Sequence, residues 1–596
     1  MPTIYSKAWN VAVWIGDRAE DSERAMDLIP SILNLKAFER ILQPDYHDTR
    51  NCSSFAAFAN LIKRSWFSRR WVVQEVALAR RVSLRCGNKI VNWDDFADAV
   101  ELFLRNLDRI CTLYDASGPL TRGLEVFNEV ELAPSRAMFS TVREVVRKGE
   151  GGTNLGGVWS IEELVVKFTS FEASDPRDTV YAFLSLANDV RGNARKQQSS
   201  RNFETPTFHV EYKKDVKTVY IDFVKFCVET TGSLDILCRR WALSAKGLVL
   251  LPSWIGIVEP TYSVSLVGPP GQPRYNASGS LPAKIFFATE AIPAENESMS
   301  LGETSTADYA SSTPITSKRK RSDEGCTKSQ KRPNVGSLRA TAQGPAEQDS
   351  NAVQESQGSA ARATENPYSQ IETRHEDEEG TQTVYTGWLD TEGIILGEIR
   401  DVSPRVVEGT IPREALNMCG LNSSSQDEAD RPNRKTPDTL WRTLVADRTT
   451  DGKTAPLWYR RACGYIMRQR SREGDLNISR LLANNTHPES VVEYLKAVQK
   501  VVWSRVFFKM ALSPLVKPFD DGRSCGFGSQ NVDKGNIVCL LYGCSVPVVF
   551  QVVSRGERQN FVVSFKGECY VHGFMNGEYF ASRGESDYAA ASFRII

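Results

Sequence analysis

The stretch SRRWVVQEVALARRVSLRCGNKIVNW, residues 68–93, sets the fold class of the N-terminal part of the chain. Its first half has apolar residues at helical spacing and begins with Ser68, a natural N-cap, so it predicts a helix. Its second half predicts a buried strand, a turn at Gly87 and Asn88, and a short extended return. One acidic residue, Glu75, lies in the middle of the apolar face of the predicted helix, and its presence there needs a physical reason.

The segments on either side of this stretch alternate between strand and helix patterns. NVAVWI, residues 10–15, is a short apolar and β-branched run that predicts a strand. Helical spacing follows in residues 25–33 and 55–62, and residues 94–107 begin a further helix with two aspartates. The order strand, helix, helix, strand, helix predicts an α/β domain over residues 1–110.

Residues 111–295 have mainly helical patterns. KKDVKTVYIDFVKFCVETTG, residues 213–232, has apolar residues at helical spacing and stops at Gly232. SDPRDTVYAFLSLA, residues 174–187, begins like a helix, with Pro176 in the first turn. These patterns predict a mainly helical region between the α/β domain and residue 295.

The composition changes between residues 301 and 380, where large aliphatic side chains are nearly absent. Such a segment cannot bury enough apolar area to offset its chain entropy, so residues 296–382 are predicted to be a disordered, low-complexity linker. Two basic clusters lie within it, at Lys318, Arg319, Lys320, Arg321, Lys331 and Arg332. Their spacing resembles a bipartite nuclear import signal, and a solvated charge run is the alternative interpretation.

Residues 383–596 predict an α+β C-terminal domain with a strand-rich end. Residues 383–403 alternate between apolar and polar side chains, and a helical section is expected around 480–511. GNIVCLLYG and VPVVFQVV then read as two strands separated by Cys544 and Ser545. A small β-barrel or a sandwich with attached helices is expected.

The overall composition limits the function classes. The chain has 596 residues, which indicates several domains, and its 73 basic and 73 acidic residues give no field that would select nucleic acid or a membrane surface. Twelve scattered cysteines without a CxxC pair indicate reduced intracellular thiols. No secretory signal or membrane-spanning run is visible, so a cytoplasmic protein is expected, with a nuclear location as the alternative through the basic clusters.

Motifs for metal or nucleotide chemistry are missing from the sequence. The five histidines have no metal-ligand spacing to one another or to cysteine, so no metal site is expected. The patterns GxGxxG, GxxxxGK[ST] and GxSxG do not occur. The sequence therefore predicts no bound cofactor.

Glu75 is the one candidate catalytic residue. Its neighbours at helical spacing are Trp71, Val72, Leu78 and Ala79. An unpaired carboxylate is costly to bury, so Glu75 must pair across the fold, reach water or have its charge used in catalysis. The structural alternative is that Glu75 caps a backbone group or pairs with an arginine, for which the nearby candidates are Arg69, Arg70, Arg80 and Arg81.

Several segments, taken together and in order, resemble the fungal heterokaryon incompatibility (HET) domain proteins. The N-terminal ones are residues 11–29, 64–93 and 175–187. Those that resemble the long C-terminal region of the family are LPSWIG (251–256), LWRTLVADR (440–448), and residues 526–550 and 567–578. In LWRTLVADR, the side chains of Trp441, Arg442 and Asp447 are either recognition residues or parts of a helix terminus.

The resemblance implies a regulatory role in self/non-self recognition and programmed cell death. The HET domain is regarded as similar to the Toll/interleukin-receptor (TIR) fold, a doubly wound α/β sheet used for homotypic assembly and, in some members, for NAD cleavage. TIR enzymes carry a catalytic glutamate on a helix that SRRWVVQE resembles, with Trp71 and Glu75 at similar spacing. By this resemblance, Glu75 would stabilise positive charge on the ribose as nicotinamide leaves.

The sequence also departs from the family pattern. The Y-x-x-L-S-Y-x-W-G and W-I-D-A-x-C-I-N-Q segments that usually come first are missing, so we expect a partial TIR-like sheet, truncated at its N-terminus within the HET domain. The strand at residues 11–15 would then have an unpaired edge, and the nucleotide pocket would lack a wall.

Three functional hypotheses remain open on the sequence alone. The first is a HET-type regulatory protein that assembles with other proteins, including copies of itself, and is not catalytically competent. The second is an enzyme that cleaves NAD as its substrate and uses Glu75, which requires the missing N-terminal elements to be supplied by an upstream exon or a partner chain. The third is a nuclear regulatory or scaffold protein.

Overall fold

The structure is a computed structural model, and its described residues are 2–19, 21–43, 49–116, 127, 129–149, 154–190, 207–243, 251–258, 265–279, 281–291, 373–376, 382–421, 436–484, 486–514, 516, 524–556, 559–581 and 590–596. Backbone contacts assign Met1–Ala291 and Glu372–Ile596 to one compact unit and Ile292–Ile371 to another. The second unit lies outside the described residues, and so do the six basic residues of the predicted import signal.

A three-stranded sheet forms the centre of the N-terminal part. β1 (Val11–Trp14) runs parallel to β2 (Val82–Cys86), which pairs antiparallel with β3 (Lys89–Asn92). The turn between β2 and β3 contains Gly87, whose φ of 52° falls in the left-handed region that glycine tolerates. The predicted strand, turn and return are present, whereas the doubly wound TIR-like sheet stays a prediction.

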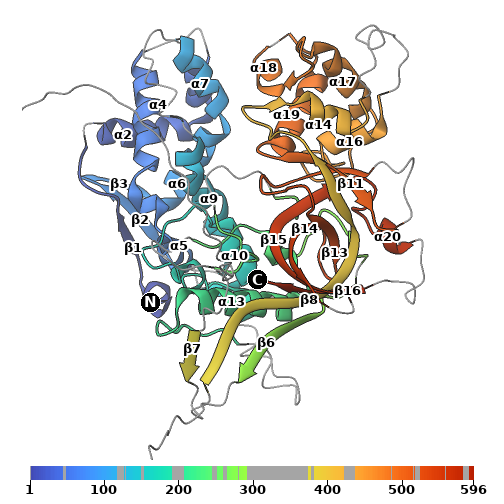
Figure 1. Ribbon diagram of the computed structural model, residues 1–596. Helices are drawn as coiled ribbons and strands as arrows, with labels where there is room; N and C mark the ends of the chain where they lie inside the picture. Colours follow the sequence, from blue (N-terminus) through green and yellow to red (C-terminus); the bar gives the residue numbers. More distant parts are fainter. Residues whose placement is uncertain are drawn as a thin grey trace, which may run out of the picture. The chain divides into compact units, whose positions relative to one another are not determined.

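Helices lie beside this sheet (Figure 1). They are α1 (Pro2–Lys7), α2 (Ser22–Leu33), α3 (Leu35–Ile41), α4 (Thr49–Ile62), α5 (Val72–Leu78), α6 (Trp93–Arg105), α7 (Leu107–Ala116) and α9 (Glu129–Val145). Helices α2, α4, α6 and α9 pack together, and their buried rings meet edge to face or stacked, as Phe58 and Phe103 do at 5.1 Å. These aromatic contacts hold the helices over the sheet.

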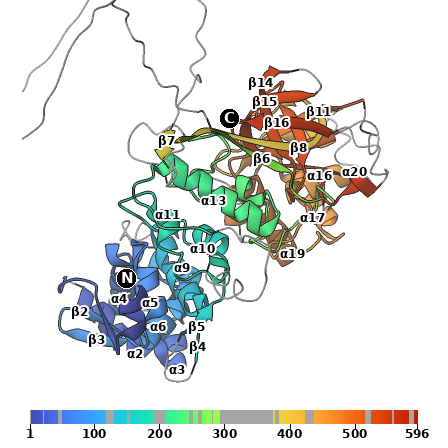
Figure 2. The same ribbon diagram turned by 90° about the horizontal axis from the view of Figure 1, so that it is seen from below.

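The next segment is helical with short strands. It contains β4 (Val146–Lys148), β5 (Asn154–Gly157), α10 (Ile161–Lys167), α11 (Asp178–Tyr181), α13 (Val216–Thr231) and the 3₁₀ helix η4 (Asp235–Cys238). The Asp215 carboxylate accepts a hydrogen bond from Thr218 N, and Gly232 ends α13 with a φ of 69°. The helix therefore stops where the sequence predicts, and it lies beside β8 (Gln382–Val402) (Figure 2).

The C-terminal sheet closes into a barrel, one of the two arrangements expected for it. Its strands are β8, β11 (Val506–Leu512), β12 (Ser524–Gly528), β15 (Asn560–Val571), β14 (Val548–Arg555) and β13 (Ile537–Leu541), in that order. Closure follows because β8 pairs with β11 on one side and with β13 on the other. β16 (Ala590–Ile595) runs parallel to β15 and antiparallel to β8.

Two further strands connect this sheet to the ends of the predicted linker. β6 (Ile285–Ala291) and β7 (Thr373–Glu376) both pair antiparallel with the first half of β8. The last residue of β6, Ala291, is in register with Thr383. Thus β6 lies in the region predicted to be mainly helical, and β7 lies inside the predicted linker range of 296–382.

A group of short helices lies next to β11 (Figure 1). It contains β9 (Thr410–Ile411), α14 (Arg413–Met418), α16 (Asp438–Leu444), α17 (Tyr459–Ile466), β10 (Leu476–Asn477), α18 (Ile478–Ala483) and α19 (Glu489–Val502), and α20 (Glu578–Ala581) follows β15. The helix expected to continue to residue 511 ends at Val502, so that part of the prediction is wrong. Ser504 has a φ of 59°, which breaks the helix, and the aromatic and β-branched residues after it form β11.

Two chemical features of the chain can be read from the described residues. Their eleven cysteines are all free thiols. No helix among them is long and apolar enough to cross a membrane.

Candidate functional site

The helix that carries Glu75 is shorter than predicted. α5 spans Val72–Leu78, with Trp71 at its N-cap position. Ser68 is not the N-cap: it ends a separate 3₁₀ turn, Ser65–Ser68, and its hydroxyl donates to Ser65 O at 3.0 Å. The prediction placed the start of the helix too early because a serine before an apolar run also fits the end of a 3₁₀ turn.

Arg70, next to the start of this helix, is fully buried and binds backbone carbonyls. Its guanidinium donates to Phe171 O at 2.7 Å and to Thr179 O at 3.3 Å. Burial lowers the pKa of Arg70 to about 10, and the neighbouring Tyr220 and Asp178 oppose this shift. Arg70 therefore anchors α5 to residues 171–179 and does not neutralise Glu75.

A second set of hydrogen bonds joins α5 to the DPRDTVYAFLSLA segment. Trp71 Nε1 donates to Asp178 Oδ2 at 2.8 Å, and the Tyr212 hydroxyl donates to Asp178 Oδ1 at 2.6 Å. The Gln74 side-chain amide donates to Ala182 O at 3.3 Å. Two of the segments that carry the family resemblance are therefore in direct contact, although they lie about a hundred residues apart in sequence.

Glu75 itself is half-buried and contacts α1. The Tyr5 hydroxyl donates a hydrogen bond to its carboxylate, and the charge of Arg69 is close enough to favour ionisation. Burial is the larger influence, so the net effect is a pKa of Glu75 above the ordinary glutamate value. Arg69, one of the four arginines that the sequence offered, acts on Glu75 through its charge, and the hydrogen bond to the carboxylate comes from Tyr5.

The structure contains cavities away from Glu75. One of about 300 Å³ lies along α13 beside His209, and one of about 510 Å³ lies at the barrel between Phe286 and Arg555. A third, of about 30 Å³, lies beside Tyr275. Glu75 lines none of these three cavities, so none of them offers a place for a substrate against its carboxylate.

No metal site is formed by the residues that the structure describes, because no group of three or more His, Cys, Asp or Glu side chains is arranged around a common point.

The LWRTLVADR segment has the geometry of a helix terminus. Trp441 Nε1 donates to Asp438 Oδ1 at 2.9 Å, and Arg442 pairs with Asp447 across the end of α16. Ala446 and Asp447 both have positive φ, near 51° and 52°, so the chain turns sharply here. These contacts account for the three side chains that the sequence singled out.

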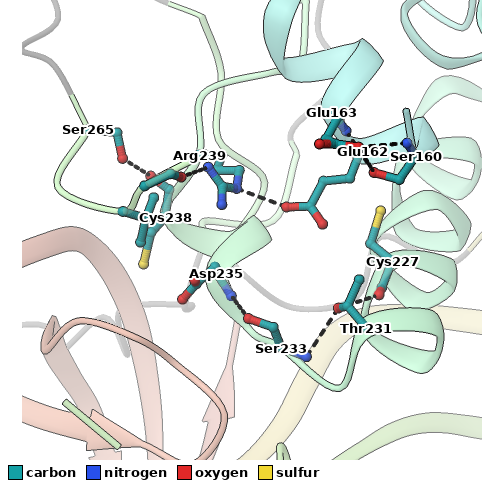
Figure 3. Close-up of polar contacts among 12 residues, drawn as sticks. Ser160, Glu162, Glu163, Cys227, Thr231, Ser233, Asp235, Cys238, Arg239 and Ser265 are labelled. Carbon is teal, nitrogen blue, oxygen red and sulfur yellow. Dashed lines mark hydrogen bonds and ion pairs between the residues drawn. The ribbon is translucent and has the colours of Figure 1, made fainter. Parts of the chain in front are cut away.

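Sequence reasoning missed two buried ion pairs. Glu162 of α10 and Arg239 point toward one another and are joined at 2.8 Å, and Arg239 also donates to Gly268 O at 2.7 Å (Figure 3). Burial raises the pKa of Glu162, and Arg239 opposes this. The second pair, Arg505 and Glu568, is 3.2 Å apart, and its side chains are 0% and 1% exposed.

Glu568 also connects the barrel to the segment before the linker. Its carboxylate accepts hydrogen bonds from Ser265 Oγ at 2.9 Å and from Leu266 N at 2.7 Å. No local pattern marks this site, because its members are about three hundred residues apart. Its dense hydrogen bonding indicates a structural joint.

Comparison with known proteins confirms the family resemblance at the N-terminus. Residues 1–75 match the family model described as Heterokaryon incompatibility protein (HET). The chain is also similar to Heterokaryon incompatibility protein 6, OR allele, of Neurospora crassa, with 28% identity over 119 residues. That match covers 15% of this chain and 18% of the relative, so the chain matches less than a fifth of the relative's length. No solved structure matches the chain.

Proposed function

We propose, from the premise that this is an HET domain protein over residues 1–75, that it has a heterokaryon-incompatibility-type role and acts through protein assembly rather than catalysis. The finer role, in self/non-self recognition and cell-death signalling in the cytoplasm, is part of the same proposal. The name of the N. crassa relative supports the general role. The mode of action rests on the geometry of β1.

The observation that carries the proposal is the open edge of β1. Val11 N donates to Arg81 O at 2.9 Å and Ile15 N donates to Arg85 O at 3.0 Å, so the alternate residues of β1 bond to β2. In a parallel pair, the amides of the residues between them, such as Ala12, point to the other edge. No other strand among the described residues pairs with β1.

An exposed aromatic side chain belongs to this strand. Trp14 of β1 is 52% exposed. Unpaired strand edges with apolar side chains are templates for another strand, and a homotypic partner would supply a strand of the same chemistry. Glu75 lies in the first turn of α5, where the Tyr5 hydroxyl donates to its carboxylate.

The test is the concentration dependence of the mass of the full chain in sedimentation equilibrium. The wild-type chain should self-associate, and Ala12→Pro should weaken this about tenfold because proline removes the edge donor and is tolerated on an edge strand. Trp14→Lys should act in the same direction. Trp503→Lys, at a residue 41% exposed after α19, is the matched control and should not change the mass.

The proposal fails if the wild-type chain stays monomeric at every concentration, or if Ala12→Pro associates as the wild type does. A parallel assay in a fungal host would compare growth arrest after expression of the same three variants. Growth arrest should weaken with Ala12→Pro and Trp14→Lys, which self-associate less, and should be unchanged with Trp503→Lys.

NAD cleavage is the second candidate function. Two observations support it. The carboxylate of Glu75 is half-buried and has a raised pKa, and Trp71 lies four residues before it, which gives the order W-x-x-x-E. Incubation of the purified chain with NAD should then release nicotinamide, and Glu75→Gln should abolish the release. Release that survives this substitution, or no release above background, contradicts the catalytic role.

A nuclear role is the third candidate. It rests on the basic clusters, which lie outside the described residues. A tagged chain with Lys318, Arg319, Lys320 and Arg321 changed to alanine should lose nuclear import. An unchanged distribution removes this candidate.

A further inference from the structure

A small cavity of about 30 Å³ lies where three segments meet: residues 265–275, the loop after α16, and α19. Three of the twelve residues that line it are cationic, Arg274, Arg448 and Lys500, and none is an Asp or Glu. The lining therefore has a strong excess of positive charge around a space the size of a small ion or head group.

Arg448 is fixed in place by neighbours. Its guanidinium donates to Arg274 O at 2.7 Å and to Asn576 Oδ1 at 2.8 Å, and it stacks over the Tyr275 ring at 4.3 Å. Asp447, 4.0 Å away, is its carboxylate neighbour and is shared with Arg442. Arg448 thus forms a rigid wall of the cavity, and part of its charge is already balanced.

Arg274, which is half-buried, and Lys500, which is exposed to solvent, have no such carboxylate neighbour in the described part of the chain. Their side-chain hydrogen bonds within the described residues go to backbone carbonyls: Arg274 Nη1 to Ser265 O at 3.5 Å, and Lys500 Nζ to Thr450 O at 3.3 Å. No carboxylate among the described residues lies within salt-bridge distance of either one. Asp451, the acidic residue of the adjoining loop, pairs with Lys453 at 2.8 Å instead.

Two like charges that line one cavity repel each other, and an anion between them removes this cost. Arginine presents several N–H donors in a plane that matches two oxygens of a phosphate, and lysine contributes a point charge. The Thr450 hydroxyl lies in the same lining.

From this arrangement we infer that the cavity is a binding site for a phosphoryl group, held by Arg274 and Lys500 against the fixed guanidinium of Arg448. Its small volume admits the phosphate head alone, so any larger organic part of the ligand lies outside. Arg274, Arg448 and Lys500 come from the three different segments, so a phosphate bound between them stabilises the contact of these segments. This site is separate from β1 and from Glu75.

The test uses the full chain and inorganic phosphate, with sodium chloride at the same ionic strength as the reference. Phosphate should raise the thermal unfolding midpoint in a saturable way, and calorimetry should give a matching Kd. Arg274→Gln and Lys500→Gln should each weaken binding about tenfold, since each removes a charge-assisted contact. Lys496→Gln, at an exposed lysine of the same helix α19 that does not line the cavity, is the matched control and should keep the wild-type Kd.

Two further arms identify the source of the phosphate. Binding of adenosine monophosphate, a phosphate monoester, is compared with binding of inorganic phosphate. The site is supported if the wild-type chain binds either ligand and if both Arg274→Gln and Lys500→Gln weaken that binding. The site is refuted if phosphate acts no more strongly than chloride and the monoester does not bind, or if both variants bind as the wild type does. Should Arg274→Gln not fold, Arg274→Lys serves in its place, and it should retain binding with a weaker Kd.

Discussion

The indole nitrogen of Trp71 lies 2.8 Å from Oδ2 of Asp178, a residue 107 positions later in the chain. This bond joins the helix that carries Glu75 to the segment DPRDTVYAFLSLA. The same carboxylate accepts the Tyr212 hydroxyl at 2.6 Å, so Asp178 holds three separate segments together. Trp71 therefore has a structural role in joining these segments, and its spacing to Glu75 is compatible with that role.

The first prediction concerns this bond. Trp71→Phe keeps an aromatic ring but removes the donor, and it should lower the free energy of unfolding by about 1–2 kcal/mol. In an Asp178→Ala background, the same substitution should cost much less. Urea unfolding of the four chains gives the coupling energy directly, and additive effects would contradict the proposed link. Trp66→Phe, at a tryptophan that makes only ring contacts among the described residues, is the control.

The second prediction concerns the pH dependence of stability at Glu75. Burial raises the pKa of Glu75 above its unfolded value, so its contribution to stability is complete in acid and is lost as the pH rises through the folded pKa. Glu75→Gln should remove this loss. The free energy of unfolding of the variant should therefore rise relative to that of the wild type as the pH increases above about 4.5. Urea unfolding between pH 4 and 8 measures the difference.

The companion variant is Tyr5→Phe. The Tyr5 hydroxyl lowers the pKa of Glu75 by donating to it, so its removal should raise that pKa further and enlarge the loss of stability at neutral pH. Glu144→Gln, at an exposed glutamate of α9, controls for the change of side chain. Parallel pH curves for the wild type and Glu75→Gln would contradict the effect of burial.

The third prediction concerns the buried pair of Glu162 and Arg239. Arg239→Met leaves a buried carboxylate without its cation and should cost about 3–5 kcal/mol. The double change Arg239→Met with Glu162→Leu should recover most of this loss, because two apolar side chains need no hydration. Chemical unfolding decides between this outcome and an additive one, in which the pair would not act as a unit.

The fourth prediction concerns thiol reactivity. Burial raises the pKa values of Cys227, Cys539 and Cys569 well above the ordinary cysteine value. Since the thiolate is the reactive form, iodoacetamide should modify these three slowly in the folded protein and rapidly in guanidinium. Mass spectrometry of the digested protein reports each site, and Cys111, which is only partly buried, should react earlier. Equal rates for all four would show that the buried segments open freely.

Local chemistry allowed much of the fold to be predicted. The α13 helix could be read from its apolar spacing and from Gly232, because both signals lie within one segment. The same holds for β2, the Gly87 turn and β3. Ser68 and residues 503–511 were misassigned because one residue type serves several backbone conformations, and only the tertiary contacts select among them.

The candidate site could be predicted only in part. The sequence offered four arginines as partners of Glu75, but it could not show that the hydrogen bond comes from Tyr5 or that Arg70 binds the carbonyls of residues 171 and 179. The contacts of Tyr5 with Glu75 and of Asp178 with Trp71 could not be predicted either, because they form only in the folded chain. The pair of Arg505 and Glu568 lies 63 residues apart with no periodic signal, so its burial appears only in the folded chain.

The register of Ala291 with Thr383 has a consequence for how this protein can change over evolutionary time. The chain leaves the sheet at the end of β6 and returns on β7, and both strands pair with the first half of β8. The free energy of closing a loop grows only with the logarithm of its length, so insertions and deletions between residues 292 and 371 have little effect on the sheet. Residues 292–371 are therefore a place where related chains can diverge in length and content while the barrel around β8 is kept.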